Sequence, residues 1–331
     1  MDLNLPLRIA GVGRYLPSRI VSSAELESRC GLTAGWVERR NGVRERRWVE
    51  GESASFMAAQ AAREALDEAG LQPGELDLII NASATSEQAL PDMGALIQRQ
   101  LGAGASGIPA MTVQTACLSF ITALEVASHF LLSGRYGRIL IASADIASCG
   151  LDFREPESAT LMGDAAAAVV VVRPAEGDSS RLCSARFRTY GEGAYLTAIL
   201  GGGSARHPHK PGHDPVDDLF HMDGPAVLRM VRRYDAGFLE ELWPGLSSGL
   251  DGIDLVVPHQ ASKVGIQLLQ RFGWPEQAIE QTIGELGNCV AASIPATLYQ
   301  AVRDGRLNRG DRLLMVGTGA GLSIGGLVLV Y

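Results

Sequence analysis

Apolar runs and helical repeats alternate along this chain, and the clearest junction between them lies at a lone cysteine. The apolar run 108–113 predicts a strand, and Cys117 follows it shortly. Beyond Cys117, steps of three or four residues define one helical face that is partly apolar: Leu118, Ile121, Leu124, Glu125, Ser128 and Leu131. A strand end that meets a helix start presents unpaired N–H groups and the positive end of the helix dipole. This position favours the nucleophilic thiolate of Cys117, and the alternative is that Cys117 is a small buried apolar residue.

Strands and helices alternate along the rest of the chain, which predicts an α/β layered architecture of sheets covered by helices. Ser22 or Ser23 is expected to cap a short helix that begins at Ala24. The other predicted elements are strands at 9–17, 75–83, 138–143 and 165–172, and helices at 54–70 and 93–101.

The chain contains an internal repeat of one strand–helix unit. The matching segments are 77–83 with 254–260, 96–99 with 268–271, and 134–141 with 305–315. We therefore expect duplicated halves, an N-terminal half at 1–175 that holds the cysteine and a C-terminal half at 176–331.

The repeat points to three residues with chemical potential. The second copy places Asn288 and Cys289 where the first copy has Cys117, and His259 ends a predicted strand. Active groups in such folds gather at the carboxyl ends of strands, so Cys117, His259 and Asn288 are candidates for one site. Each also has a structural interpretation, a buried histidine for His259 and a turn former for Asn288.

Composition excludes several classes of function. The 331 residues are 46% hydrophobic and carry a net charge of −8, which argues against nucleic-acid binding. No apolar run approaches the roughly 20 residues of a membrane span, and no signal peptide is expected at the N-terminus. Five cysteines without framework spacing fit free thiols in the cytoplasm.

Three weaker motifs do not suggest a site of their own. Only ten residues follow Gly317-x-Gly319-x-Gly321, too few for a dinucleotide-binding unit. The histidines at 207, 209 and 213 lie in a Gly/Pro-rich stretch unlike a metal-ligand pattern, so no metal is expected. The arginines at 39, 40, 44, 46 and 47 are expected to form a solvated face with one or two phosphate contacts.

Short motifs stand in order along nearly the whole chain: Gly11-x-Gly13-x-Tyr15-Leu16-Pro17, Trp36-Val37-x-x-Arg40-x-Gly42-Val43, Ala116-Cys117, Gly163-Asp164, Pro258-His259-Gln260-Ala261, Gly287-Asn288-x-x-Ala291-Ala292-Ser293-x-Pro295 and Gly317-Thr318-Gly319-Ala320-Gly321. In this set the chain resembles the thiolase-like ketosynthases, and most closely β-ketoacyl-acyl carrier protein synthase III. The resemblance implies a thiolase-like fold of layered αβαβα architecture.

The resemblance also implies a decarboxylating condensation. Cys117 would hold an acyl group as a thioester, and His259 and Asn288 would stabilise the enolate of a malonyl-type extender. Backbone N–H groups of Cys117 and of the Gly319–Ala320 turn would form the oxyanion hole. No metal or organic cofactor would be needed.

The resemblance further implies partners, namely acyl-CoA, malonyl-CoA or malonyl-acyl carrier protein, and a second copy of the chain in a homodimer. Trp36, Arg40 and Lys263 would contact coenzyme A, tryptophan by stacking and the cations by charge. The chain departs from the family pattern at several positions near this region: Pro225, Ser262, Lys263, Val264 and Leu286. These departures favour a specialised enzyme for unusual acyl thioesters over a housekeeping one.

Two other functions fit the same residues. An acyltransferase could use Cys117 to acylate an oxygen or nitrogen acceptor, in which case no carbon dioxide would be released. A silent partner subunit of a ketosynthase heterodimer would not need Cys117, His259 and Asn288 together, so their joint presence argues against it.

Overall fold

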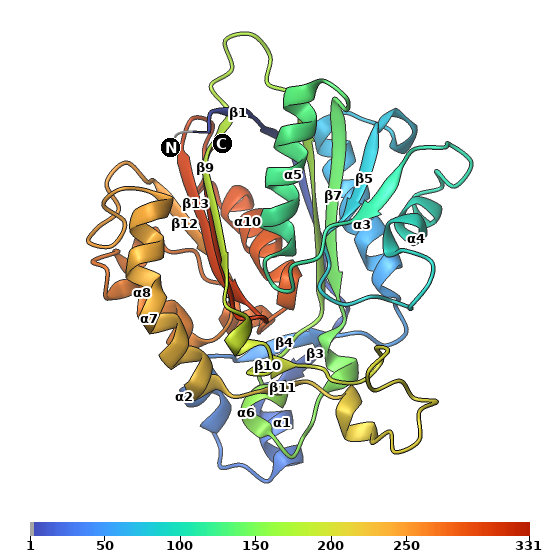
Figure 1. Cartoon of the computed structure of the whole chain (residues 1–331), viewed down its shortest axis with the longest axis vertical. Helices are drawn as coiled ribbons and strands as arrows, with labels where there is room; N and C mark the ends of the chain where they lie inside the picture. The colour runs from blue at the N-terminus through green and yellow to red at the C-terminus, as the bar shows by residue number, and fades with distance from the viewer. Residues whose placement is uncertain (1–2) are drawn as a thin grey trace.

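Two five-stranded sheets form the framework of the chain, of which the structure, a computed structural model, describes residues 3–331 (Figure 1). The first sheet has the order β2 (Arg8–Tyr15), β8 (Ala165–Val172), β7 (Arg138–Asp145), β5 (Leu78–Asn81) and β6 (Ala110–Thr112). The second has the order β1 (Leu5–Pro6), β9 (Arg181–Thr189), β14 (Ser323–Val330), β13 (Arg312–Gly319) and β12 (Leu255–Pro258). In the first sheet β5 runs parallel to β6 and β7, and in the second sheet β12 runs parallel to β13. The pairs β7–β8 and β13–β14 are antiparallel.

Helices fill three layers around the two sheets (Figure 1). The central layer holds α5 (Ser119–Ser133) and α10 (Ser293–Arg303), which lie between the sheets. The first sheet is covered on its outer face by α3 (Ala54–Ala69) and α4 (Met93–Gln100). The second is covered by α7 (Gly224–Leu242) and α8 (Lys263–Gln270). This α-β-α-β-α order confirms the predicted layered, thiolase-like architecture.

Helix α5 is apolar because both of its faces meet a sheet. The stretch Ala116–Ser133 is long and apolar enough to cross a membrane by length and composition, and it is the one such helix within residues 3–331. In the fold it contributes Leu118, Ile121 and Leu124 to the core between the two sheets. A helix that is apolar on most sides is typical of such a buried layer.

Local signals place most element ends correctly. The Ser22 hydroxyl accepts the Glu25 N–H at 3.2 Å and caps α1 (Ser23–Cys30), as predicted. Gly70 ends α3 in the left-handed conformation at φ 67°, also as predicted. The predicted strand at 75–83 is shorter in the structure, where β5 spans Leu78–Asn81 and the Asp77 carboxylate before it accepts the Arg138 N–H at 2.8 Å.

Smaller elements gather at one end of the two sheets, at the bottom of Figure 1. They are β3 (Arg19–Ser22), α2 (Trp36–Asn41), β4 (Glu45–Trp48), α6 (Pro156–Ala159), β10 (Thr197–Ala198), β11 (His221–Met222) and α9 (Ile283–Leu286). Single 3-10 turns occur at Pro73–Glu75, Ala147–Gly150, Gly191–Gly193, Pro215–Asp218, Glu276–Ala278 and Val290–Ala292.

The prediction that the arginine-rich segment is a solvated face is wrong for Arg46. Its side chain is fully buried, and its guanidinium donates to the Val21 carbonyl, the Ser23 hydroxyl and the Thr160 carbonyl. Burial lowers the pKa of Arg46 to about 10. Alternation along β4 places this arginine on the inner side of the strand, where three oxygen acceptors surround its charge.

The strand pair β7–β8 of the first half and the pair β13–β14 of the second half have the same register. Arg138 pairs with Val172 and Asp145 with Ala165 across the β7–β8 hairpin, and the β13–β14 hairpin repeats this pairing from Arg312 to Gly319. Asp145 and Gly319 are therefore equivalent positions. The predicted division at 175/176 falls between β8 and β9, while β1 pairs with β9 in the second sheet.

The turns that precede the two central helices are also equivalent. The Ser119 hydroxyl accepts the Thr115 N–H at 3.0 Å, and the Ser293 hydroxyl accepts the Cys289 N–H at 3.0 Å. This pairing aligns Cys117 with position 291 and Thr115 with Cys289. The prediction that Asn288 and Cys289 occupy the place of Cys117 is therefore wrong by two to three positions, because the loops before the helices differ in length.

Candidate active site

Cys117 lies in a tight turn immediately before α5. Ala116 takes the left-handed conformation at φ 50°, and the Ser119 hydroxyl donates to the Ala116 carbonyl at 2.6 Å. The N–H groups of Cys117 and of Ala320, which follows β13, both point at the Cys117 sulfur. Two backbone donors therefore converge where an oxygen anion would form next to the sulfur.

The prediction that this position favours a thiolate is wrong for the free protein. Burial and the nearby Asp145 carboxylate raise the pKa of the Cys117 thiol to about 12, although the two N–H groups oppose this rise. The helix terminus is therefore outweighed by desolvation, which disfavours the charged sulfur. Cys117 is a neutral thiol at neutral pH.

His259 follows β12 and packs directly on a glycine of β13. Its backbone N–H donates to the Val316 carbonyl at 2.9 Å, and its side chain is almost fully buried. A Cβ placed on Gly317 would lie only 2.6 Å from the Cβ of His259, so a side chain there would displace the imidazole. Burial lowers the pKa of His259 to about 4, which leaves a neutral ring with one N–H to donate.

Asn288 is held beside His259 by its own side chain. The Oδ1 atom accepts the Val290 N–H at 2.9 Å, and Nδ2 donates to the Ala261 carbonyl at 3.2 Å. The Ala261 N–H in turn donates to the His259 carbonyl at 2.9 Å. One N–H of the Asn288 amide thus anchors the residue to the His259 segment, and the second N–H remains for a substrate oxygen.

Two glycines of β13 bring the cysteine and the histidine together. Gly317 and Gly319 lie two residues apart, so they face the same side of the strand. His259 packs on Gly317, and a Cβ on Gly319 would lie 3.4 Å from the backbone nitrogen of Cys117. The structure therefore places His259, with Asn288 bound to its segment, and the backbone nitrogen of Cys117 at neighbouring glycines of β13. Of the predicted oxyanion donors, the N–H groups of Cys117 and Ala320 point at the sulfur, and the role of Gly319 stays a prediction.

A cavity of about 320 Å³ leads to His259 between α7 and α8. Its wall includes Pro258, Gly317 and Thr318 at the inner end, but neither Cys117 nor Asn288. The remaining wall is mostly apolar: Leu228, Val231, Phe238, Leu239, Leu268 and Phe272. A flexible, weakly polar chain fits such a wall better than a charged group does.

Comparisons with known proteins agree with this geometry. The family profile described as 3-Oxoacyl-[acyl-carrier-protein (ACP)] synthase III matches residues 111–191, and its C-terminal profile matches 247–331. The beta-ketoacyl-[acyl-carrier-protein] synthase III of Aquifex aeolicus is 34% identical over 98% of this chain and 99% of its own length. The chain belongs to the β-ketoacyl-acyl carrier protein synthase III family.

The structure also resembles solved synthase III structures over nearly the whole chain. The crystal structure of the Aquifex aeolicus protein superimposes with a TM-score of 0.87, at 33% identity, covering 98% of this chain and 100% of that one. A 3-oxopimeloyl-[acyl-carrier-protein] synthase of Brucella abortus is 35% identical over 98% of both chains. The priming β-ketosynthase of the R1128 polyketide pathway superimposes with a TM-score of 0.87 at 28% identity, covering 100% of this chain and 97% of that one.

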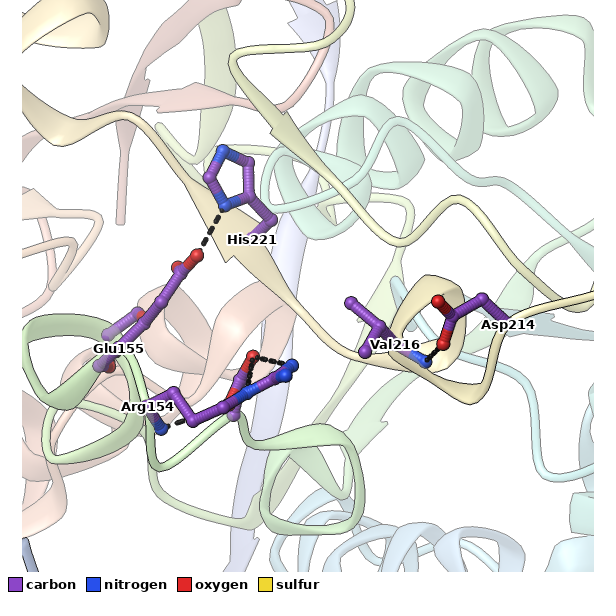
Figure 2. A network of polar contacts seen from close by, with 7 residues as sticks. Arg154, Glu155, Asp214, Val216 and His221 are labelled. Atoms are coloured by element: carbon purple, nitrogen blue, oxygen red, sulfur yellow. Dashed lines mark hydrogen bonds and ion pairs between the residues drawn. The ribbon is translucent and has the colours of Figure 1, made fainter.

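Carboxylates line a second cavity of this synthase III. Trp36, the first residue of α2, lines this cavity of about 450 Å³ together with Glu155, Glu157, His221 and Asp223. Figure 2 shows the His221 imidazole next to the Glu155 carboxylate, at 2.8 Å from Nδ1 to Oε1. Two of these carboxylates therefore already have a polar partner, Glu155 with His221 and Glu157 with Arg40.

Of the three residues predicted to bind coenzyme A, two line the cavities and one does not. Arg40 lines the first cavity and Trp36 the second, but the Arg40 guanidinium is paired with the Glu157 carboxylate at 2.8 Å. Lys263 begins α8 and lines neither of these two cavities. Its aliphatic carbons pack against Gly42, where an added Cβ would lie 2.9 Å from the Lys263 Cβ.

Sequence reasoning missed two residues that shape the site. The charge of Asp145, at the end of β7, raises the pKa of the Cys117 thiol, and Gly317 leaves the space that His259 occupies. The repeat contained a signal for Asp145, because the equivalent position in the second copy is the motif residue Gly319. No pattern in the sequence indicated the contact between Gly317 and His259.

Proposed function

We propose that this synthase III joins an acyl group to a malonyl-type extender in two steps on Cys117. In the first step the sulfur attacks an acyl thioester, the acyl group moves to Cys117, and the thiol proton leaves with the departing thiol. In the second step the extender loses carbon dioxide, and the electron pair of the broken bond forms an enolate. Its carbon attacks the acyl-Cys117 carbonyl, the β-ketoacyl thioester departs, and the sulfur recovers a proton.

This proposal is supported by two pairs of donor groups that lie at neighbouring glycines of β13, Gly319 and Gly317. The N–H groups of Cys117 and Ala320 suit the tetrahedral oxyanion on the acyl carbon. The neutral His259 ring and the free N–H of Asn288 suit the thioester oxygen of the extender. A neutral imidazole favours this role because it donates a hydrogen bond without placing a buried cation beside the departing carbon dioxide.

The substrates are acyl thioesters whose carrier arm enters between α7 and α8. The apolar cavity that ends at His259 supports this route for the arm. Pairing of Arg40 with Glu157 supports weak binding of coenzyme A and a specialised thioester donor. The names of the Brucella abortus and R1128 relatives support a role outside housekeeping initiation, in specialised fatty-acid or secondary-metabolite synthesis.

Intact-protein mass spectrometry tests the covalent step. Incubation with a panel of acyl-CoA and acyl-carrier-protein thioesters should add the mass of one acyl group to the native protein and none to Cys117→Ala. The adduct would also identify the preferred acyl chain and carrier. An adduct that persists in Cys117→Ala, or no adduct with any donor of either kind, would contradict the assignment of Cys117 as the nucleophile.

Release of carbon dioxide separates condensation from its alternatives. The acyl-loaded protein should release carbon dioxide from a malonyl thioester and yield a β-ketoacyl product. An acyltransferase would load Cys117 without releasing carbon dioxide, and a silent partner subunit would do neither.

We also propose that the enzyme is a cytoplasmic homodimer that needs no metal or organic cofactor. The proposed steps are acid–base and nucleophilic chemistry alone, and residues 3–331 hold no group of three His, Cys, Asp or Glu side chains suited to a metal ion. Strand β6 lies at the edge of the first sheet, where its unpaired backbone groups could pair with a second copy. Light scattering that gives a monomer mass would contradict the dimer.

A further inference from the structure

Asp145 ends β7 as a fully buried carboxylate with four hydrogen-bond donors. Its Oδ1 atom accepts the Ala84 N–H at 3.0 Å, the Thr85 N–H at 2.8 Å and the Thr85 hydroxyl at 2.8 Å. Its Oδ2 atom accepts the Ala291 N–H at 3.1 Å. The carboxylate therefore joins the loop after β5, in the first half of the chain, to the turn before α10 in the second half.

That turn also fixes the amide of Asn288. Val290 takes the left-handed conformation at φ 52°, and its N–H donates to the Asn288 Oδ1 atom at 2.9 Å. The next N–H along the chain, from Ala291, is the one that Asp145 accepts. Successive N–H groups in such a turn form an anion-binding nest at the start of a helix. The orientation of Asn288 thus depends on the 290–291 turn, and Asp145 fixes this turn by accepting the N–H of Ala291.

The duplicated fold gives this contact a counterpart at the active cysteine. Ala291 is equivalent to Cys117, and Asp145 is equivalent to Gly319. In one half the Asp145 carboxylate accepts the N–H of the nest. In the other half the equivalent residue is glycine, so no carboxylate reaches the N–H of Cys117, and an added Cβ would lie only 3.4 Å from that nitrogen. The comparison indicates that both nests bind a negatively charged oxygen, one from the protein and one from the reaction.

We propose that Asp145 is a positioning residue for the decarboxylation step, which it supports by holding the Ala291 turn and, through it, the amide of Asn288. The inference rests on the proposed function, because it assigns Asp145 to one of the two proposed steps. Asp145 is not expected to support acyl loading, since its negative charge raises the pKa of the Cys117 thiol. Loss of this charge should therefore affect the two steps in opposite directions.

The test compares Asp145→Asn with the native protein in two assays at pH 8. Both oxygens of the Asp145 carboxylate accept hydrogen bonds, whereas the amide of an asparagine has one oxygen and one NH2 group. The NH2 group must face either the N–H of Ala291 or the donors at residues 84 and 85, so at least one hydrogen bond is replaced by a contact between two donors. We expect kcat for release of carbon dioxide from a malonyl thioester to fall about 10- to 100-fold, with KM unchanged, because the Asn288 amide is displaced. Alkylation of Cys117 by iodoacetamide should become about threefold faster or more, because a nearby negative charge is lost.

Thr85→Val serves as the matched control. It removes one donor to Oδ1 but leaves the bond between Asp145 and Ala291, so both rates should stay within about threefold of native. A parallel fall of both rates in Asp145→Asn would indicate a general structural defect and overturn the inference. An unchanged decarboxylation rate in Asp145→Asn would overturn it while leaving the proposed function intact. Absence of decarboxylation by the native protein would instead refute the proposed function, and this inference with it.

Discussion

Gly317→Ala is the substitution that most directly tests the placement of His259. The added methyl carbon would lie 2.6 Å from the Cβ of His259 and 3.3 Å from the Cδ2 atom of Leu118. Carbon atoms in contact prefer separations of about 3.5 to 4.0 Å, so the two Cβ atoms must move apart by roughly 1 Å. The backbone N–H of His259 is tied to the Val316 carbonyl, so the strands themselves resist this movement.

Two magnitudes follow from this geometry. Overpacking of a well-filled core by one methyl group costs about 1 to 3 kcal/mol of the free energy of unfolding. Misplacement of a catalytic group by about 1 Å costs about 100-fold in rate. We therefore expect Gly317→Ala to remain folded at 25 °C but to release carbon dioxide from a malonyl thioester about 100-fold more slowly. Acyl loading of Cys117 should fall much less, because the atoms nearest to the added methyl group belong to His259 and Leu118.

Gly326→Ala is the matched control for this experiment. Its methyl carbon would also meet a carbon atom at 2.6 Å, the Cδ2 atom of Leu242 on α7. A loss of stability no larger than that of Gly317→Ala is expected, because Cδ2 is the flexible end of the leucine side chain, and decarboxylation should stay within about threefold of native. Decarboxylation at the native rate by folded Gly317→Ala would refute the reasoning, since His259 could then be moved without consequence. An equal loss in both variants would show that overpacking, and not the histidine, controls the rate.

Four further outcomes are expected. The rate of Cys117 alkylation by iodoacetamide should rise about tenfold per pH unit from pH 7 to 10 without levelling near 9, because the pKa of the thiol is raised to about 12; a plateau near pH 9 would contradict this. Gly319→Ala should slow acyl loading about tenfold or more by crowding the N–H of Cys117, as a thioester burst assay would show. Glu157→Gln should lower KM for acyl-CoA severalfold by releasing Arg40, whereas an unchanged KM would exclude Arg40 from phosphate binding. Arg46→Met should lower the free energy of unfolding by about 3 kcal/mol in urea titrations, because it leaves buried acceptors unpaired.

Much of the architecture could be predicted because its signals are local. Hydrophobic periodicity and capping residues such as Ser22 and Gly70 depend on neighbours within one turn of helix, so the sequence indicates where elements begin and end. The repeat predicted the duplicated halves for the same reason, since two similar segments fold by the same local rules. It could not fix the alignment of Cys117 with Ala291, because that depends on the lengths of loops that the repeat does not share.

The ionisation states could not be predicted, because they depend on burial by distant segments. The position of Cys117 before a helix favours the thiolate, but desolvation and Asp145, from a strand that follows α5, reverse this. Arg46 was expected in solvent from its charged neighbours, yet Val21, Ser23 and Thr160 enclose it. The burial and the neighbouring charges that set the pKa of a side chain come mostly from segments that are distant in the sequence.

The sequence alone indicated which side chains are the candidates for chemistry in this protein: one cysteine at a helix start, one histidine at a strand end and one asparagine after a glycine. Tertiary structure alone decided how they meet. Because Gly317 has no side chain, His259 can pack on β13, and because Gly319 has none, the N–H of Cys117 can approach the same face of the strand. In the other half, Asp145 accepts the equivalent N–H, that of Ala291. The physical reason is that close approach is set by the absence of side chains on a neighbouring strand, which is a property of packing between segments and not of either segment by itself.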